Sequence, residues 1–365
     1  MKSSKAKFGR IVIKVGSNVI TMGDGSLNTG RMLRIVEQIA VLMKQGYEVI
    51  LVTSGAVAAG RAELVPSRKT SLISSKQIWA AIGQVRLMSN YQFLFGKYGI
   101  GAGQVLAVKD SFRDRHHYLN MKNCISSMLE NHILPVINEN DTISVNELMF
   151  TDNDELSGMI AAMMDCGTLI ILSNVDGIYN GPPSEKGSVL LKEISGGSNE
   201  IDGYITPSTS EFGRGGMQTK YSIARRIARE GINVFIANGM RDSIVLDIIR
   251  EKDVPYTHIV ASEKKKNSVK KWLSHSDTFA KGIVYVNDGA RDALLTGKTS
   301  LLMIGVSRIS GFFKKGDIIR IYDEKGRQLG LGKSGYDSGK AEACLGKKLK
   351  VPLVHNDYLS INQDE

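Results

Sequence analysis

Two clusters of Asn, Asp and Glu flank one loop in the middle of the chain. Residues 135–157 read PVINENDTISVNELMFTDNDELS, so the first cluster (138–141) ends an apolar run and the second (151–154) precedes another apolar stretch. Such residues are common in turns and helix caps, and capping is the simpler interpretation of either cluster alone. Two clusters that meet across one loop could instead bind a polar ligand, and the rest of the chain bears on that choice.

Lys14 is the first cation whose position calls for a partner. It follows Ile-Val-Ile in a segment that has the character of a buried strand. A buried ammonium is costly unless an anion or a carboxylate meets it, although a lysine that snorkels from a strand edge is the alternative. Gly16 and Ser17 follow it, and Ser54 begins a similar small-residue turn. Backbone N–H groups in such turns can approach an anion closely.

A glycine-rich loop, EFGRGGMQTK at 211–220, precedes a basic helix and places Lys220 near the first turn. A cation there opposes the helix dipole, whereas a phosphate bound at the helix start would make it favourable. A surface loop with an incidental lysine is the alternative. Two lysines, glycine-rich backbone and Asn/Asp clusters are the parts that phosphoryl transfer to an anionic acceptor requires.

The first 255 residues alternate between strand-like and helix-like segments. Runs of Val, Ile and Leu without polar alternation predict buried parallel strands at 10–15, 48–52, 103–108, 134–137, 168–172 and 233–237. Helical periodicity predicts helices at 31–45, 75–95, 117–131, 154–165 and 217–230. This order predicts a three-layer α/β fold, in which a mainly parallel sheet has helices on both faces. Ligands of such sheets bind beyond the carboxyl ends of the strands.

A Lys-rich segment, SEKKKNSVKKWLSHS at 262–276, separates this part from short strands and tight turns. We predict a catalytic domain over 1–258, a charged linker over 259–277 and a small, mostly β domain over 278–365. Strands are expected at 282–286, 318–322 and 328–331, with a turn at the Asn-Asp-Gly of 287–289.

Composition points to a cytoplasmic protein. The polar N-terminus lacks the features of a signal peptide, and no apolar run approaches the ~20 residues of a membrane helix. Three distant cysteines, Cys124, Cys166 and Cys344, predict neither disulfides nor a zinc cluster. The net charge is +10, and residues 251–365 hold 20 Lys and Arg against 14 Asp and Glu. A solvated surface explains this basic third as readily as an RNA partner does.

Five segments resemble, in this order, those of the glutamate 5-kinases of the amino acid kinase superfamily: IVIKVGSN, VTSGAVAAGR, PVINEND, DNDELS and GRGGMQTK. The C-terminal segments GIVYVNDGA and GFFKKGD resemble a PUA domain. The resemblance implies ATP-dependent phosphorylation of the γ-carboxylate of L-glutamate to L-glutamyl 5-phosphate, the first step of proline biosynthesis. It also implies Mg²⁺ bound mainly by ATP, inhibition by proline, and a homo-oligomer, either a dimer or a tetramer.

The resemblance also implies roles for residues. Lys14 and Lys220 would bind the phosphates, and Asp154 would orient both lysines. The residues expected to hold glutamate are Ser54, Asp141 and Asn153. Those expected at the nucleotide, besides the lysines, are Gly16, Ser17, Ser173, Asn174, Arg214, Gly215, Gly216, Met217, Gln218 and Thr219. Ser173-Asn174 departs from the family's usual Thr-Asp, and no residue is expected to be a direct metal ligand.

Two other classes of function compete with this interpretation. One is another amino acid kinase, for acetylglutamate, aspartate, carbamate or UMP; the two polar clusters and the PUA-like tail argue against it. The other is an RNA-binding or regulatory protein, against which Lys14, Lys220 and Asp154 argue. Phe312, Phe313 and Tyr322 would form only part of a stacking platform. We therefore expect the second domain to be structural or regulatory, with RNA binding less expected.

Overall fold

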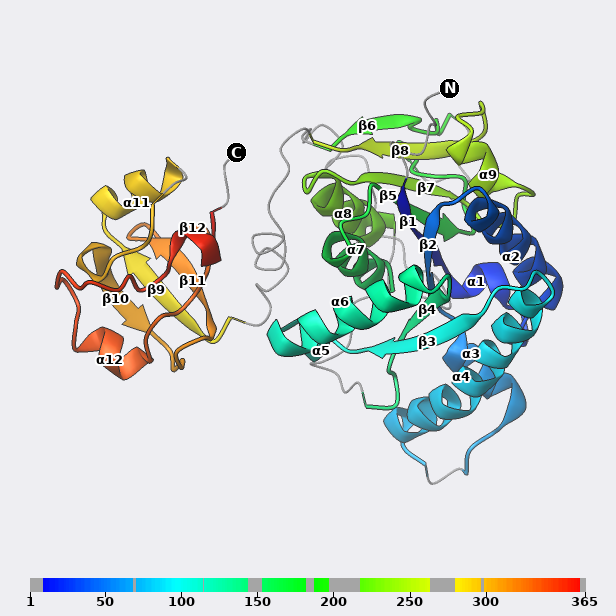
Figure 1. Cartoon of the computed structure of the whole chain (residues 1–365), viewed down its shortest axis with the longest axis horizontal. Coiled ribbons are helices and arrows are strands. Elements are labelled where there is room, and N and C mark those ends of the chain that lie inside the picture. The colour runs from blue at the N-terminus through cyan, green and yellow to red at the C-terminus, as the bar shows by residue number, and fades with distance from the viewer. Residues whose placement is uncertain are drawn as a thin grey trace. The chain divides into compact units, whose positions relative to one another are not determined.

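The computed structural model describes residues 9–67, 70–113, 115–143, 153–181, 187–196, 217–262, 280–296 and 299–361. The chain divides into two compact units, Met1–Lys265 and Lys266–Glu365, shown in Figure 1. Each unit has a hydrophobic core of its own.

The first unit is built on an eight-stranded sheet of order β3-β4-β2-β1-β5-β7-β8-β6. Neighbouring strands are parallel except for β7 and β8. The strands are β1 (Arg10–Val15), β2 (Glu48–Thr53), β3 (Ala102–Ala107), β4 (Leu134–Glu139), β5 (Thr168–Ser173), β6 (Glu193–Ser195), β7 (Asn233–Asn238) and β8 (Tyr256–Val260). The predicted mainly parallel α/β fold is confirmed.

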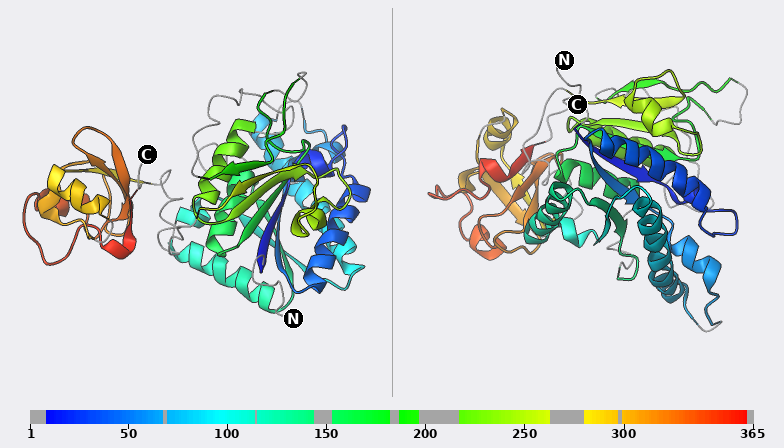
Figure 2. Two further views of the ribbon diagram at one scale, coloured as in Figure 1. Left: turned by 90° about the horizontal axis from the view of Figure 1, so that it is seen from above. Right: turned by 45° about the vertical axis from the view of Figure 1, so that its right-hand side comes forward.

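Helices cover both faces of this sheet (Figures 1 and 2). One face carries α6 (Arg115–Glu130), α7 (Asn153–Met163) and α8 (Met217–Ala228). The other carries α2 (Thr29–Lys44), α4 (Leu72–Gly96) and α9 (Ile244–Ile249). The short helices are α1 (Ser17–Ile20), α3 (Ala56–Glu63) and α5 (Asp110–Arg113). In the part of the chain that the structure describes, no helix has the length and apolar character to cross a membrane.

The period of two along β1 decides which way Lys14 points. Ile11, Ile13 and Val15 belong to the core that includes α2, α4 and α9. Successive side chains of a strand point to opposite faces, so Lys14 lies on the face covered by α7. It does so one residue before the carboxyl end of the strand.

Two features of the first unit differ from the sequence prediction. The segment at β3 was expected to be buried on both faces, but most of its residues are partly exposed, because β3 is an edge strand paired only with β4. The antiparallel strand β8 and the short strand β6 were not expected. They continue the sheet beyond β7 with only five and three residues.

The second unit has a five-stranded sheet of order β10-β9-β11-β12-β13, which confirms a mostly β fold. Its strands are β9 (Gly282–Val286), β10 (Val306–Ser310), β11 (Ile318–Asp323), β12 (Gln328–Lys333) and β13 (Leu359–Ile361), with helices α11 (Asp288–Leu295) and α12 (Ser338–Glu342). The turn predicted at 287–289 is wrong. Asn287 instead caps α11, its side-chain oxygen accepting a hydrogen bond from the Ala290 N–H at 2.9 Å.

Helices α3 and α4 touch through two glycines. A Cβ atom at Gly83 of α4 would lie 1.7 Å from the carbonyl oxygen of Ala56, and one at Gly60 of α3 would lie 1.9 Å from that of Trp79. Both clashes are with backbone, which cannot move without separating the helices. This contact fixes α4 against α3, which begins directly after the turn at the end of β2.

We expect Gly83→Ala to lower the free energy of unfolding by about 3 kcal/mol, because the methyl group overlaps a backbone carbonyl. Gly96→Ala, in the same helix, is the control: nothing lies within 4 Å of its added Cβ. Urea denaturation of both variants measures the difference. Equal stability of the two would mean that α3 and α4 separate at no cost.

Candidate active site

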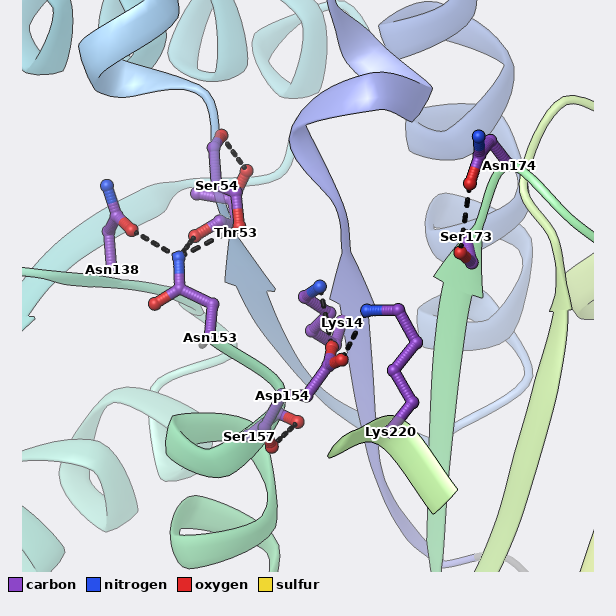
Figure 3. Close-up of polar contacts among 10 residues, drawn as sticks. All are labelled: Lys14, Thr53, Ser54, Asn138, Asn153, Asp154, Ser157, Ser173, Asn174 and Lys220. Atoms are coloured by element: carbon purple, nitrogen blue, oxygen red, sulfur yellow. Dashed lines mark hydrogen bonds and ion pairs between the residues drawn. The ribbon is translucent and has the colours of Figure 1, made fainter. Parts of the chain in front are cut away.

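Three charged side chains that are far apart in the sequence meet at the carboxyl end of β1. Asp154 accepts Lys14 Nζ on Oδ1 at 2.6 Å and Lys220 Nζ on Oδ2 at 2.5 Å. The Asp154 side chain is 0% exposed, and the Lys14 and Lys220 side chains are 3% and 13% exposed. Figure 3 shows both ammonium groups turned toward the one carboxylate. We call these three residues the charge cluster.

Helix packing brings the charge cluster together. Asp154 stands in the first turn of α7, where the helix dipole favours a carboxylate, and Lys220 stands in the first turn of α8, where the dipole disfavours a cation. Helix α7 approaches α8 closely at Gly158, where an added Cβ would lie 2.7 Å from Ile227 Cδ1. This close approach places Asp154 beside Lys220, and their ion pair offsets the unfavourable interaction of Lys220 with the dipole of α8.

Opposing effects act on the pKa of Asp154. Burial alone raises the pKa of this carboxyl group, but the charges of Lys14 and Lys220 and their hydrogen bonds outweigh burial. The net pKa is well below the usual value, so Asp154 is ionised at neutral pH. Both of its oxygens are occupied by lysines, which makes it an orienting group for two cations and not a proton acceptor.

A second cluster, made of amide and hydroxyl groups, lies beside the charge cluster. Asn153 Nδ2 lies 2.9 Å from both the Thr53 carbonyl oxygen and Ser54 Oγ, and 3.0 Å from Asn138 Oδ1. Asn153 was expected in the site, and its side chain bridges to the end of β2. Its own Oδ1 is buried and has no hydrogen-bond partner among the described residues. Asp141 lies two residues beyond β4 and is half-buried.

Helix α4 contributes to this amide cluster through side chains spaced seven residues apart. Gln77 Nε2 donates to the Thr142 carbonyl oxygen at 2.8 Å, Gln84 Oε1 accepts from Asn138 Nδ2 at 2.8 Å, and Tyr91 OH lies 2.9 Å from Thr53 Oγ1. The sequence analysis placed Asn138 and Thr53 at strand ends and missed the others. A heptad spacing of Gln77, Gln84 and Tyr91 along one helix is the signal that was available.

Residues expected at the nucleotide lie on the other side of the charge cluster. Figure 3 shows Ser173 and Asn174 opposite the amide cluster, and the order β4-β2-β1-β5 of the sheet agrees with this placement. Ser173 Oγ donates to Asn174 Oδ1 at 3.4 Å. Gly16 precedes α1, which starts at Ser17, and the Gly16 N–H donates to the Leu172 carbonyl oxygen at 3.1 Å.

The glycine-rich loop is only partly within the described residues. Arg214, Gly215 and Gly216 lie outside them, so their predicted contacts stay predictions. Met217, Gln218 and Thr219 form the start of α8, immediately before Lys220.

A further ion pair, which the sequence analysis missed, joins the loops after β5 and β7. Arg241 binds Asp176 through two hydrogen bonds of 2.8 Å, and Asn238 Nδ2 donates to the same carboxylate at 3.0 Å. The hydrogen bond from Arg241 is the main reason that the pKa of Asp176 is lowered. This pair ties together the two loops that border Ser173 and Asn174.

The donor atoms needed for direct metal coordination are not gathered in the described part of the chain, where no group of three His, Cys, Asp or Glu side chains converges. Asp154 has both oxygens bound to lysines. The described residues therefore do not fit a metal ion held by the protein alone.

The three aromatic residues considered for stacking in the second unit, Phe312, Phe313 and Tyr322, lie in different surroundings. Phe313 is fully buried in the core and unavailable for stacking, whereas Phe312 is 73% exposed. Tyr322 lies next to Tyr285, with ring centroids 5.9 Å apart, and the Arg308 guanidinium lies 3.8 Å from the Tyr285 ring centroid.

The family of the chain follows from a comparison with known proteins. Residues 9–238 match the amino acid kinase family, and residues 266–352 match the PUA domain. The chain belongs to the amino acid kinase family, whose fold is the three-layer unit that carries the charge cluster.

Relatives over nearly the full length make the assignment more specific. The glutamate 5-kinase of Bacteroides thetaiotaomicron is 51% identical over 98% of this chain and 99% of its own length. That of Chlorobaculum tepidum is 45% identical, covering 96% and 97%. Within the family the chain is one of the glutamate 5-kinases.

Solved structures show the fold alone. An isopentenyl phosphate kinase in complex with its substrate has a TM-score of 0.50 and 17% sequence identity, over 69% of this chain and 100% of that one.

Asp154→Asn should destabilise the protein by about 3–5 kcal/mol at pH 7, because two buried ammonium groups lose their shared counter-charge. The folded-state pKa is below the ordinary ~3.9, so this stabilisation is complete above that pH and is lost as the pH falls through the folded value. The difference between the two proteins should therefore shrink in acid. Urea denaturation from pH 7 down to pH 2 measures it, because the decrease begins only below the ordinary pKa of ~3.9.

Asp253→Asn is the matched control, since Asp253 pairs with Lys192 at the surface and little change is expected. A pH-independent difference between wild type and Asp154→Asn would contradict the assignment of the effect to this carboxylate.

Proposed function

We propose that the chain transfers the γ-phosphoryl group of ATP to the γ-carboxylate of L-glutamate, producing L-glutamyl 5-phosphate and ADP. The charge cluster carries this proposal, because it offers two buried ammonium groups between an amide cluster and the strand end of Ser173. An acceptor bound on one side and a nucleotide bound on the other would meet at the lysines.

The amide cluster supports an amino acid as the acceptor. Asn153 Oδ1, which is buried and without a partner in the described part of the chain, would accept a hydrogen bond from the α-ammonium group. Asp141 would supply an opposite charge for that ammonium group. Ser54 Oγ, 2.9 Å from Asn153 Nδ2, lies where the substrate would extend toward the charge cluster.

The chemistry requires positioning more than proton transfer. The γ-carboxylate is already ionised at neutral pH, so its oxygen can attack the γ-phosphorus without a general base. The new O–P bond forms as the bond from phosphorus to the β,γ-bridging oxygen breaks, and ADP leaves with that electron pair. Lys14 and Lys220 would stabilise the charge on the transferring group, and Asp154 would keep both ammonium groups in place.

The nucleotide would bind along the ends of β1 and β5 and the start of α8. Gly16 and Ser17 would contribute backbone N–H groups, Ser173 and Asn174 would line the nucleotide, and residues 214–220 would surround its phosphates. Mg²⁺ would arrive bound to the ATP oxygens, which suits a site whose described residues do not hold a metal themselves. When bound, the ion would neutralise phosphate charge.

The remaining expectations concern the wider role of the enzyme. The reaction would be the first step of proline biosynthesis, with proline bound at the glutamate site as an inhibitor. Assembly as a dimer or tetramer, and a structural or regulatory role for the second unit, stay predictions. So do the domain limits 1–258, 259–277 and 278–365.

Lys220→Ala should lower kcat at least about 100-fold with the fold retained, the usual effect of removing one electrostatic stabiliser. Glutamate-dependent ADP release, with the acyl phosphate trapped as its hydroxamate, measures the rate. Lys192→Ala, which removes an exposed lysine that is also paired with a carboxylate, is the control and should keep full activity. A near-normal kcat for Lys220→Ala would remove this residue from the mechanism.

Asp141→Asn should raise KM for glutamate far more than KM for ATP, because it removes the charge proposed to meet the α-ammonium group. Proline carries the same charged group, so its inhibition should weaken in the variant, and in wild type it should weaken as glutamate rises. Steady-state kinetics at several proline concentrations test this. Equal effects on both substrates would mean that Asp141 only shapes the loop.

A further inference from the structure

The hydrogen bonds of the amide cluster fix the orientation of three side-chain amides in series. Asn153 Nδ2 lies 2.9 Å from the Thr53 carbonyl, which only accepts, so this atom must be the nitrogen. The same nitrogen donates to Asn138 Oδ1, which also accepts from the Glu139 N–H at 2.9 Å. Asn138 Nδ2 must then donate, and it donates to Gln84 Oε1.

This series leaves two polar atoms without a partner, one at each end. Asn153 Oδ1 is an acceptor at one end, and Gln84 Nε2 is a donor at the other. Both atoms are buried, and neither has a hydrogen-bond partner among the described residues. Because buried polar groups nearly always have partners, two complementary orphans in one cluster indicate a bound group with both a donor and an acceptor. The α-carbon of an amino acid carries both.

The position of Gln84 decides which end of the substrate it would meet. Gln84 bonds to Asn138 on β4, whereas Lys14 is on β1, with β2 between them. Two strand spacings, about 10 Å, therefore separate Gln84's partner strand from the strand of Lys14. The γ-carboxylate must reach the lysines for transfer, so the carboxylate near Gln84 is the α-carboxylate.

We propose that Gln84 Nε2 binds the α-carboxylate of the substrate and so selects an amino acid with this group unmodified. The inference rests on the proposed function, because it assigns one end of the same substrate. Gln77 and Tyr91, one heptad before and after Gln84, hold the Thr142 and Thr53 segments. Helix α4 would thereby position three segments of the glutamate site and add one direct contact of its own.

Gln84→Glu tests the direct contact and leaves the series intact. The new side chain keeps an acceptor for Asn138 Nδ2 but presents a second oxygen where the donor was. We expect KM for glutamate to rise at least about tenfold, with kcat and KM for ATP changed less than about threefold, because a binding group is lost far from the transferred phosphoryl group. Gln92→Glu makes the same change on an exposed position of α4 and should have no effect.

A substrate analogue separates binding of the α-carboxylate from a merely structural role. L-isoglutamine has an amide in place of the α-carboxylate and keeps the γ-carboxylate. The carboxylate introduced by Gln84→Glu can accept a hydrogen bond from the amide of isoglutamine. In this variant the ratio of kcat/KM for the substrate glutamate to that for isoglutamine should therefore fall at least about tenfold. If this variant does not fold, Gln84→Met removes both the donor and the acceptor of the Gln84 amide without adding charge. The ratio should then also be lower than in wild type.

The results distinguish the two proposals. The role of Gln84 is overturned if a folded Gln84 variant keeps the wild-type ratio of kcat/KM for glutamate to that for isoglutamine. If wild type still releases ADP with glutamate, the proposed function stands. Wild type with no glutamate-dependent ADP release overturns both. A lower ratio with near-normal kcat supports the contact, since a general loosening of the site would affect both substrates alike.

Discussion

The ion contact of one buried carboxylate with two lysines is the constraint on which the rest of the site depends. Asp154 has no exposed surface, and its charge is acceptable only because Lys14 and Lys220 each meet one of its oxygens. Removing Asp154 would take the shared counter-charge from both buried ammonium groups, whereas removing one lysine would leave Asp154 paired with the other. The end of β1 and the starts of α7 and α8 must therefore keep their relative positions for the protein to be stable as well as active.

The same contact links stability to chemistry. A lysine in the first turn of a helix, and another inside a buried strand, are both unfavourable in isolation. Each becomes acceptable through Asp154, and each then presents an ammonium group at the edge of the sheet where ligands bind. A phosphoryl group that approaches this edge would meet cations already oriented and largely shielded from water, which is the condition under which electrostatic stabilisation is strongest.

The flanks of the charge cluster differ in kind, and this asymmetry supports different ligands on the two sides. Toward β2 and β4 the groups are neutral amides and hydroxyls in a continuous hydrogen-bond series that ends on α4. Toward β5 and β7 the loops are tied by the Asp176–Arg241 pair. The first surroundings suit a small substrate with donors and acceptors at one carbon, and the second lie at the strand end where the nucleotide is proposed to bind.

Much of this could be read from the sequence, because its signals are local. Apolar runs located six strands of the first unit, and periodicity located its long helices, since burial against a sheet imposes both patterns. Lys14 inside an apolar run indicated either a counter-charge or a lysine that snorkels from a strand edge, and the order of the motifs identified the family. One failure was local in origin, because Asn-Asp-Gly at 287–289 suits a turn as well as a helix cap, and only the chain that follows decides between them.

The tertiary structure alone decided which groups meet. Residue patterns alone could not show that the carboxylate facing Lys14 also faces Lys220; only the family resemblance implied it, since the contact depends on the close approach of α7 and α8 at Gly158. Nor could they show Gln84 in the site, because a glutamine on a helix is usually solvated, and its partner Asn138 lies 54 residues away. Local pattern specifies elements, whereas contacts between distant residues depend on how strand order and helix packing place those elements in space.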